Sequence, residues 1–293
     1  MTLEFHAITI ERQHEYRELL ARCPAKSSDY SFTNLWGWAK EHSMDWAWAG
    51  DLVWLRQNMP TRSLWAPVGD WRGIDWQEYL QPHALAGTVF ERIPDPLVEA
   101  WRESLGHCIE VKESREHWDY LYEVDELINL KGNRFHKKKN LVNQFRNKYD
   151  FRYVPLNAGT VDIALGMQEN WCTWRDCESF ETLASENRVI SRVLSNWENL
   201  AGLMGGAIMV DRKIAAYTIG QALTPDTLVI HFEKGDSSFK GAYQAINQMF
   251  LDHAGKDFKT VNREQDLGDE GLRKAKLSYN PTAFEKKYRV IFT

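Results

Sequence analysis

Short apolar segments alternate with polar turns through the second half of the chain. Apolar residues at 205–210 and 214–219 flank the polar turn Asp211-Arg212-Lys213, a pattern that predicts a β-hairpin. A third strand is predicted at 227–232, after the turn Thr224-Pro225-Asp226. Three strands joined by short turns predict a sheet in this part of the chain.

A polar loop ends at Gly241, and the residues after it have the spacing of a helix. The apolar positions recur three or four residues apart and predict one helix face packed on a sheet: Ala242, Ala245, Ile246, Met249 and Phe250. Another strand is predicted at 258–262. The order strand, strand, strand, loop, helix, strand indicates a mixed α/β fold.

The first half repeats that order more faintly. Strands are predicted at 46–49, 52–56, 63–66 and 88–92, with a helix at 75–85 before the last of them. The two halves share the order of elements and not their residues. We therefore interpret the chain as a diverged tandem of one α/β unit.

We expect two domains, residues 1–117 and 118–293, with the boundary before the apolar strand Tyr120-Leu121-Tyr122. Tryptophan supports this division, because ten of the 13 tryptophans lie in the first 118 residues. We expect these rings to fill the core and interfaces of the first domain rather than to stack on a ligand. With 43% apolar residues among 293, the chain has enough apolar surface for two cores.

The sequence shows no targeting or metal-binding pattern. The longest nearly uncharged apolar stretch, 201–210, is half the length that a membrane-spanning helix needs, and Glu4 and Glu11 stand where a signal peptide would be basic and then apolar. We expect a cytoplasmic protein without a transmembrane segment. The nine His residues form no ligand spacing, so no metal is expected.

Positive charge is concentrated in one segment although the net charge of the protein is −5. Residues 131–148 contain no Asp or Glu and seven basic residues: Lys131, Arg134, Lys137, Lys138, Lys139, Arg146 and Lys148. We expect this segment to form the first helix of the second domain, buried through Leu141, Val142, Phe145 and Tyr149. A polyanion partner explains the lysines, and so does an ordinary solvated face; the sequence leaves both open.

A dense polar cluster follows the strand predicted at 258–262. It consists of Asn262-Arg263-Glu264-Gln265-Asp266-Leu267-Gly268, then Gly271 to Lys276, then Ser278-Tyr279-Asn280-Pro281. Polar side chains beside a buried strand are costly unless they pair or bind a ligand, and ligands of α/β proteins usually sit at strand ends. A salt-bridged structural turn is the alternative.

Gly241 suggests an anion site. A glycine that opens a helix lets the backbone approach a ligand closely, and the helix amides with the positive end of the helix dipole favour phosphate. Basic residues in the same half support this interpretation: Lys234, Lys240, Arg273 and Lys276. A glycine also serves as an ordinary N-cap, so the signal is weak by itself.

Three of these stretches resemble a known family. His231-Phe232-Glu233-Lys234, Gly241-Ala242-Tyr243-Gln244-Ala245-Ile246-Asn247 and residues 262–281 are similar to the C-terminal catalytic domain of phosphatidylglycerol lysyltransferases and its stand-alone cytosolic relatives. Gly132 to Asn140 fits the opening of the same region. The resemblance covers 118–293 by motif and the remainder by architecture. The membrane-spanning half of the full lysyltransferases has no counterpart in this chain.

The resemblance implies an α/β (α+β) fold with two tandem domains like the GCN5-related acetyltransferases, similar to the Fem peptidyltransferases that use aminoacyl-tRNA. In that fold the loop that opens the helix cradles the phosphates of the donor. Lys234, Lys240, Gly241, Arg273 and Lys276 would then bind donor phosphate. The counterpart loop around 69–76 contains Asp70 and Asp75, which repel phosphate, so the first domain is expected to be degenerate and structural.

Acyl transfer needs a base for the nucleophile and an acid for the leaving group. Glu233, Glu264 and Asp266 are the carboxylates that the resemblance places for the first role, and Tyr279, with a reference pKa of about 10, suits the second. Arg273 and Lys276, three residues apart on one helix face, would steady developing charge.

The leading hypothesis is an acyltransferase that moves an aminoacyl group from aminoacyl-tRNA to an unknown soluble or lipid acceptor. Basic residues would contact the RNA: Arg134, Lys137, Lys138 and Lys139. Two alternatives remain open, an acyl-CoA-dependent N-acetyltransferase and a non-catalytic binding protein of the same fold. No covalently bound cofactor is expected, since acyl-CoA or aminoacyl-tRNA would serve as donor substrate.

Overall fold

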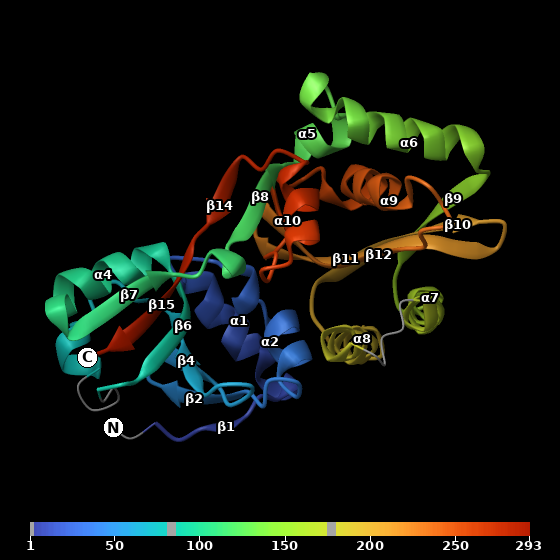
Figure 1. Ribbon diagram of the computed structural model, residues 1–293. Coiled ribbons are helices and arrows are strands. Elements are labelled where there is room, and N and C mark those ends of the chain that lie inside the picture. The colour runs from blue at the N-terminus through green and yellow to red at the C-terminus, as the bar shows by residue number, and fades with distance from the viewer. Residues whose placement is uncertain (1–2, 81–85, 175–179) are drawn as a thin grey trace. The chain divides into compact units, whose positions relative to one another are not determined.

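The computed structural model describes residues 3–80, 86–174 and 180–293, and these form two compact units (Figure 1). The first unit comprises Met1–Asp119, Gln265–Glu270 and Phe284–Thr293. The second comprises Tyr120–Glu264 and Gly271–Ala283. The chain first changes unit two residues after the boundary predicted at 117/118. The prediction of continuous domains did not include the two C-terminal segments that belong to the first unit.

The first unit is built on an eight-stranded mixed sheet. Its main path runs β1-β2-β3-β4-β6-β15-β7, and β5 pairs with β3. The strands are β1 (His6–Ala7), β2 (Asp45–Ala49), β3 (Leu52–Gln57), β4 (Ser63–Trp65), β5 (Val68–Gly69), β6 (Val89–Pro94), β7 (Ile109–Glu113) and β15 (Lys287–Phe292). The four strands predicted here are confirmed as β2, β3, β4 and β6. β15 lies between β6 and β7, so the C-terminal strand completes the sheet of the first unit.

Four α-helices belong to the described part of the first unit: α1 (Gln13–Arg22), α2 (Phe32–Trp38), α3 (Trp76–Leu80) and α4 (Asp95–Leu105). The helix predicted at 75–85 is α3 as far as Leu80, and residues 81–85 lie outside the described residues. Tryptophan fills the core as expected, with seven of the ten N-terminal rings buried: Trp36, Trp46, Trp54, Trp65, Trp71, Trp76 and Trp101.

The second sheet has seven strands in the order β14-β8-β13-β12-β11-β10-β9. They are β8 (Asp119–Glu123), β9 (Phe151–Leu156), β10 (Leu203–Val210), β11 (Lys213–Thr224), β12 (Thr227–Gly235), β13 (Thr260–Asn262) and β14 (Ala283–Glu285). The predicted hairpin is confirmed as β10 and β11, and Asp211 and Arg212 make its turn with φ of 48° and 66°. The strands predicted at 227–232 and 258–262 are confirmed as β12 and β13.

Two features of β12 position the side chains of the candidate site. It pairs in parallel with β13 only from Thr227 to Val229, and then runs past the end of β13 while it stays paired with β11 on its other side. A β-bulge interrupts its pairing with β11, because Ile219 and Gly220 face Phe232 and Ile230 and leave His231 as the extra residue. Bulges re-aim side chains and are frequent beside functional sites.

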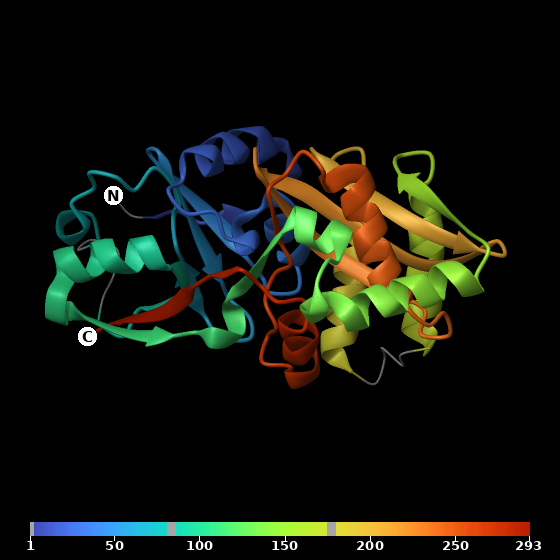
Figure 2. The ribbon, with the colours of Figure 1, turned by 90° about the horizontal axis from the view of Figure 1, so that it is seen from above.

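Helices cover both faces of the second sheet (Figures 1 and 2). One face carries α5 (Val124–Asn129), α6 (His136–Lys148), α9 (Ala242–Phe250) and the π-helical turn Leu251–Gly255, and the other carries α7 (Val161–Trp174) and α8 (Glu181–Leu194). The predicted stripe of α9 packs with Phe145 of α6 on β10 and β11. α10 (Glu270–Leu277) follows β13.

The basic segment is helical from His136, after a short 3₁₀ turn at Asn133–Phe135. It is not the first helix of the second unit, because α5 precedes it. Val142 and Phe145 are buried as predicted, and Leu141 and Tyr149 are half-buried. Its cations are exposed, with the exception of the half-buried Lys138. Among the described residues, no helix is both long and apolar enough to span a bilayer.

Candidate functional site

Glu233 and Arg263 form an ion pair where β12 runs beyond the end of β13. The Arg263 Nη2 atom lies 2.9 Å from Glu233 Oε1, and the side chains are only 12% and 11% exposed. Asn247 of α9 donates from Nδ2 to the other carboxylate oxygen of Glu233 at 3.1 Å. Desolvating an ion pair is costly unless further hydrogen bonds satisfy it, and Asn247 supplies one.

Tyr279 also packs against Arg263. The guanidinium carbon lies 4.7 Å from the centre of the phenol ring, and the Lys138 ammonium of α6 lies 4.1 Å from it. Burial raises the pKa of Tyr279 to about 12, with the charge of Arg263 acting in the opposite direction. The hydroxyl also interacts with Gln244 of α9. Tyr279 is therefore a protonated phenol in contact with two cations.

α10 closes the cluster through its backbone and Lys276. The Lys276 ammonium donates to the carbonyl oxygen of Arg263 at 2.5 Å, and the Tyr122 hydroxyl donates to the carbonyl of Lys276 at 2.9 Å. Lys276 is buried and holds the polypeptide in place, whereas Arg273 is half-buried. The structure thus brings Lys276 to the site as a positioning group.

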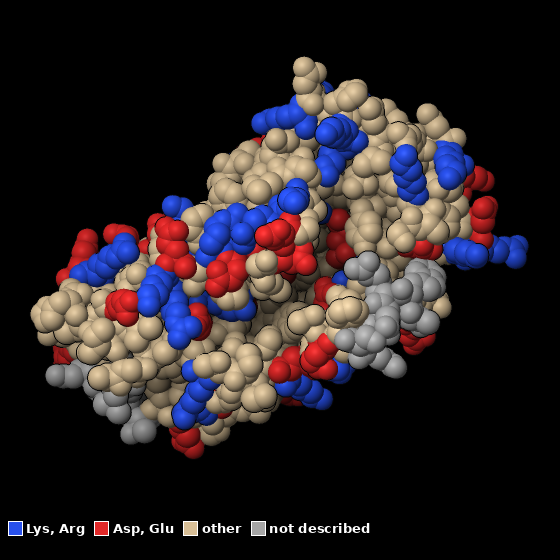
Figure 3. Space-filling model, in the orientation of Figure 1, with Lys and Arg blue, Asp and Glu red and all other residues tan. Residues whose placement is uncertain are grey.

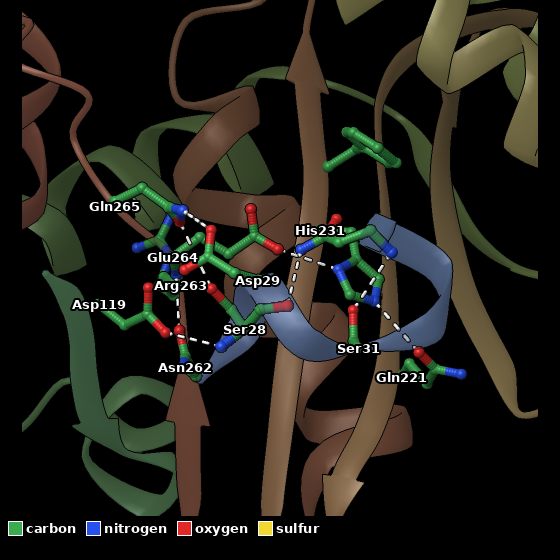
Figure 4. Close-up of polar contacts among 12 residues, drawn as sticks. Ser28, Asp29, Ser31, Asp119, Gln221, His231, Asn262, Arg263, Glu264 and Gln265 are labelled. Carbon is green, nitrogen blue, oxygen red and sulfur yellow. Dashed lines mark hydrogen bonds and ion pairs between the residues drawn. The ribbon is translucent and has the colours of Figure 1, made fainter. Parts of the chain in front are cut away.

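A second polar pair, His231 with Glu264, lies next to this cluster (Figure 4). The Nδ1 atom of His231 is 2.9 Å from Glu264 Oε1, and Nε2 is 3.4 Å from Gln221 Oε1. The bulge in β12 places the His231 ring, which is fully buried. Glu264 has a φ of 55°, and its backbone N–H donates to Asn262 Oδ1 at 2.8 Å, so the chain turns sharply where β13 ends.

Asp266 belongs to the first unit, where its buried side chain lies 3.2 Å from Arg115 Nη1 and accepts from the N–H of Gly268 at 2.9 Å. The Asp266 carboxylate is therefore paired within a salt-bridged turn. Such a turn was the alternative interpretation of the polar cluster after β13 from the sequence.

Gly241 is the N-cap of α9, with a φ of 89°. A Cβ atom there would lie 2.4 Å from the carbonyl oxygen of Leu141, so α6 is what approaches the glycine closely. The N–H groups of Lys240 and Ala242 already donate to the Tyr149 hydroxyl and to the Phe239 carbonyl. Packing explains the glycine, and a donor phosphate at Gly241 and Lys240 stays a prediction.

Lys234 points to the opposite face of the sheet from Glu233. Its ammonium lies 2.6 Å from Glu186 Oε2 on α8 and 4.2 Å from the Trp171 ring centre on α7. Neighbouring residues of a strand face opposite sides. The structure therefore does not bring Lys234 together with Gly241.

The exposed cations expected to bind RNA lie on and just before α6. Figure 3 shows Lys and Arg side chains spaced along this edge of the second unit. Lys137 and Lys139 are exposed, and Arg134 is paired with Glu126. Lys138 departs from this group, because its ammonium turns inward to Tyr279.

His231, Arg263 and Asn247 stand in the sequence motifs, but the sequence predicted no role for them. Asn247 had no signal either, since it lies outside the predicted apolar stripe of α9, although the structure buries it to 1% exposure. Arg263 had none that separated it from its polar neighbours. Among the described residues, no group of three His, Cys, Asp or Glu side chains is placed to hold a metal ion.

A family model described as phosphatidylglycerol lysyltransferase, C-terminal, matches residues 20–291. That match spans nearly the whole chain. The chain belongs to this family. The predicted fold class is confirmed by the structure: an α/β protein of two units built on mixed sheets flanked by helices.

Solved structures of similar proteins extend over the whole chain. A conserved protein of unknown function from Bacteroides thetaiotaomicron VPI-5482 is 29% identical, with a TM-score of 0.88 over 99% of this chain and 100% of that one. The C-terminal domain of a putative lysylphosphatidylglycerol synthetase from Agrobacterium fabrum is 12% identical, with a TM-score of 0.67 over 97% and 92%. L-PGS from Bacillus licheniformis is 11% identical, with a TM-score of 0.63 over 95% and 91%. The proteins from Agrobacterium fabrum and Bacillus licheniformis thus have the same fold as this chain.

One curated relative is similar in sequence. It is an uncharacterised protein of Mycoplasmoides gallisepticum, 26% identical over 176 residues, or 59% of this chain. The match spans 55% of the length of that relative.

Proposed function

We propose that this protein transfers an aminoacyl group from aminoacyl-tRNA to an acceptor, and that the reaction occurs at the cluster around Arg263. One observation carries the proposal: Lys138 of the basic helix α6 reaches the ring of Tyr279, a proton donor of the cluster. A polyanion on the outer face of α6 would thus lie close to groups that handle protons. Membership in the lysyltransferase family supports a transferase activity.

The residues suit the two proton transfers of the reaction. Glu264 accepts the proton of the acceptor's amine or hydroxyl while that nitrogen or oxygen bonds to the acyl carbon. The ester bond to the ribose oxygen then breaks, and Tyr279 donates its proton to the leaving oxygen. His231 holds the Glu264 carboxylate in place at 2.9 Å. Proton return from Glu264 to Tyr279 through water restores the enzyme.

Glu233 has a different task in this scheme. Both of its oxygens are occupied, one by Arg263 and one by Asn247. A carboxylate engaged in this way orients Arg263 rather than taking a proton. The transfer site therefore retains Glu264 and Tyr279 from the predicted catalytic set, with Glu233 as a positioning residue.

Binding of tRNA tests the donor assignment. The affinity for aminoacyl-tRNA should fall steeply with salt, since each neutralised phosphate releases counterions. The double variant Lys137→Glu with Lys139→Glu should lower the salt slope by about two and weaken binding by more than tenfold. Fluorescence anisotropy with labelled tRNA between low and moderate salt measures both quantities.

Lys213→Glu with Lys259→Glu is the matched control, because both lysines are exposed in the same unit and lie outside α6. It should bind within a factor of two or three of the parent. Equal weakening in the two double variants contradicts the α6 surface. Saturable thermal protection by acetyl-CoA, without binding to tRNA, would select the acyl-CoA alternative.

A further inference from the structure

Arg263 keeps one unused hydrogen-bond donor in the second unit. Its Nη1 atom is buried and has no hydrogen-bond partner among the described residues, while Nη2 binds Glu233. A buried donor without an acceptor is destabilising, so native proteins rarely leave a charged one unsatisfied. At the end of β13, the Nη1 group of Arg263 is therefore a cationic donor without an acceptor.

Lys138 presents a second cation to the same place. It is the half-buried lysine of α6, and its ammonium stands over the Tyr279 ring on which Arg263 also packs. No carboxylate of the described residues forms an ion pair with it. Burial, followed by the charge of Arg263, lowers the pKa of Lys138, and Glu233 opposes this. Two cations thus share the single carboxylate of Glu233.

The other charged groups around Tyr279 are already satisfied. Glu233 is held by Arg263 and Asn247, and Lys276 donates to the carbonyl of Arg263. The unbalanced charge of the cluster is consequently positive, and it is concentrated at Lys138 and Arg263. A small anion fits this excess, because both groups are hydrogen-bond donors to oxygen.

We propose that Lys138 and Arg263 bind a small oxyanion, a phosphate or a carboxylate group of a substrate, beside the ring of Tyr279. This inference deepens the proposed function, on which it rests for the identity of the substrate. A phosphate would come from the donor, and a carboxylate from the acceptor. Lys138 then serves the transfer site, whereas Lys137 and Lys139 on the same helix face outward to RNA.

Thermal unfolding in the presence of small anions tests this site without RNA. The protein is titrated with inorganic phosphate in one series and with acetate in another, and sodium chloride keeps the ionic strength constant. At least one anion should raise the melting temperature in a saturable way. Protection by phosphate identifies a phosphate group, and protection by acetate alone identifies a carboxylate.

Lys138→Met should weaken the protecting anion at least tenfold. Lys148→Met is the matched control, because Lys148 also stands over a tyrosine ring, 5.0 Å from the centre of Tyr149, at the exposed end of α6. It should change the affinity less than twofold. Lys138→Arg, which keeps the charge, should retain most of the binding and excludes a general loss of folding.

Two results overturn the site: no saturable protection of the parent protein by either anion, or equal weakening by Lys138→Met and Lys148→Met. The same experiments distinguish a failure of the anion site from a failure of the proposed function. Anion binding without tRNA affinity rejects the tRNA donor and leaves the site standing. Binding of tRNA without anion protection rejects this site alone.

Discussion

Glu285 of the first unit lies near Asp119 and Lys287. Burial, together with the charge of Asp119, raises the pKa of its carboxyl to about 7, although Lys287 acts in the opposite direction. An unfolded glutamate titrates at about 4.3. Between these values the folded state holds the proton more tightly, so the contribution of Glu285 to stability is lost as the pH rises from about 4.3 through 7.

Glu285→Gln should therefore stabilise the protein at high pH only. We expect a gain of about 1–3 kcal/mol at pH 8 and little change at pH 4.5, since one pKa unit corresponds to about 1.4 kcal/mol. Urea unfolding at the two pH values measures the difference. Glu113→Gln, at an exposed position of β7, is the control and should be neutral at both. A gain for Glu285→Gln that is equal at the two pH values contradicts the shifted pKa.

For single residues, the sequence predicted where the polar cluster lies, but not which of its side chains belong to which unit. Glu264, Glu233 and Tyr279 were named from their positions at strand ends and from the family resemblance, and they lie around Arg263. The alternation of a strand already turns Lys234 away from Glu233. The chain passes into the other unit after Glu264, so Asp266 belongs to the first unit, a change that no local pattern indicates.

The contact of α6 with α9 links the basic helix to the site. It depends on Gly241, where the Leu141 carbonyl takes the space of a side chain. Gly241→Ala adds this clash to the cost of a left-handed backbone, about 1–2 kcal/mol. We expect a loss of about 3 kcal/mol or more in the free energy of unfolding, measured by denaturant titration.

Gly73→Ala separates the two costs. Gly73 also has a left-handed φ, of 76°, but no atom lies within 4 Å of the position that its Cβ would take. It should lose only the backbone part, about 1 kcal/mol. Equal losses in the two variants would show that the approach of α6 to Gly241 is not tight.

Elements with strong periodicity were predictable. α9 and the β10–β11 hairpin follow directly from the spacing of their apolar residues and from a polar turn. α4 was missed although Leu97, Val98, Trp101 and Leu105 form a buried stripe. The bulge at His231 had no signal in the sequence, because it depends on how β12 pairs with β11.

At the scale of the whole molecule, the C-terminal strand ties the first unit together. β15 lies between β6 and β7, and Lys287 at its start contacts the buried carboxylates of Asp29 and Asp119. These partners are far away in sequence, which is why two continuous domains were predicted. Local patterns predict the elements of each unit but not this long-range pairing.

A chain that ends at Lys286 should lose the stability of the first unit selectively. It lacks β15, leaves the edges of β6 and β7 unpaired, and leaves two buried carboxylates without their lysine, which costs several kcal/mol. Hydrogen exchange should accelerate in β6 and β7 and change little in β10 and β11. Unchanged protection in β6 and β7 would contradict the central place of β15.

Transfer of an aminoacyl group to hydroxylamine tests directly whether the cluster around Arg263 is an aminoacyl transfer site. Hydroxylamine replaces the unknown acceptor, and the amino acid hydroxamate that forms from aminoacyl-tRNA is measured against the rate without enzyme. The protein should accelerate its formation, and Tyr279→Phe and Glu264→Gln should each reduce the acceleration about 100-fold or more without unfolding the chain. No acceleration above background, or full activity of both variants, would contradict an aminoacyl transfer site around Arg263.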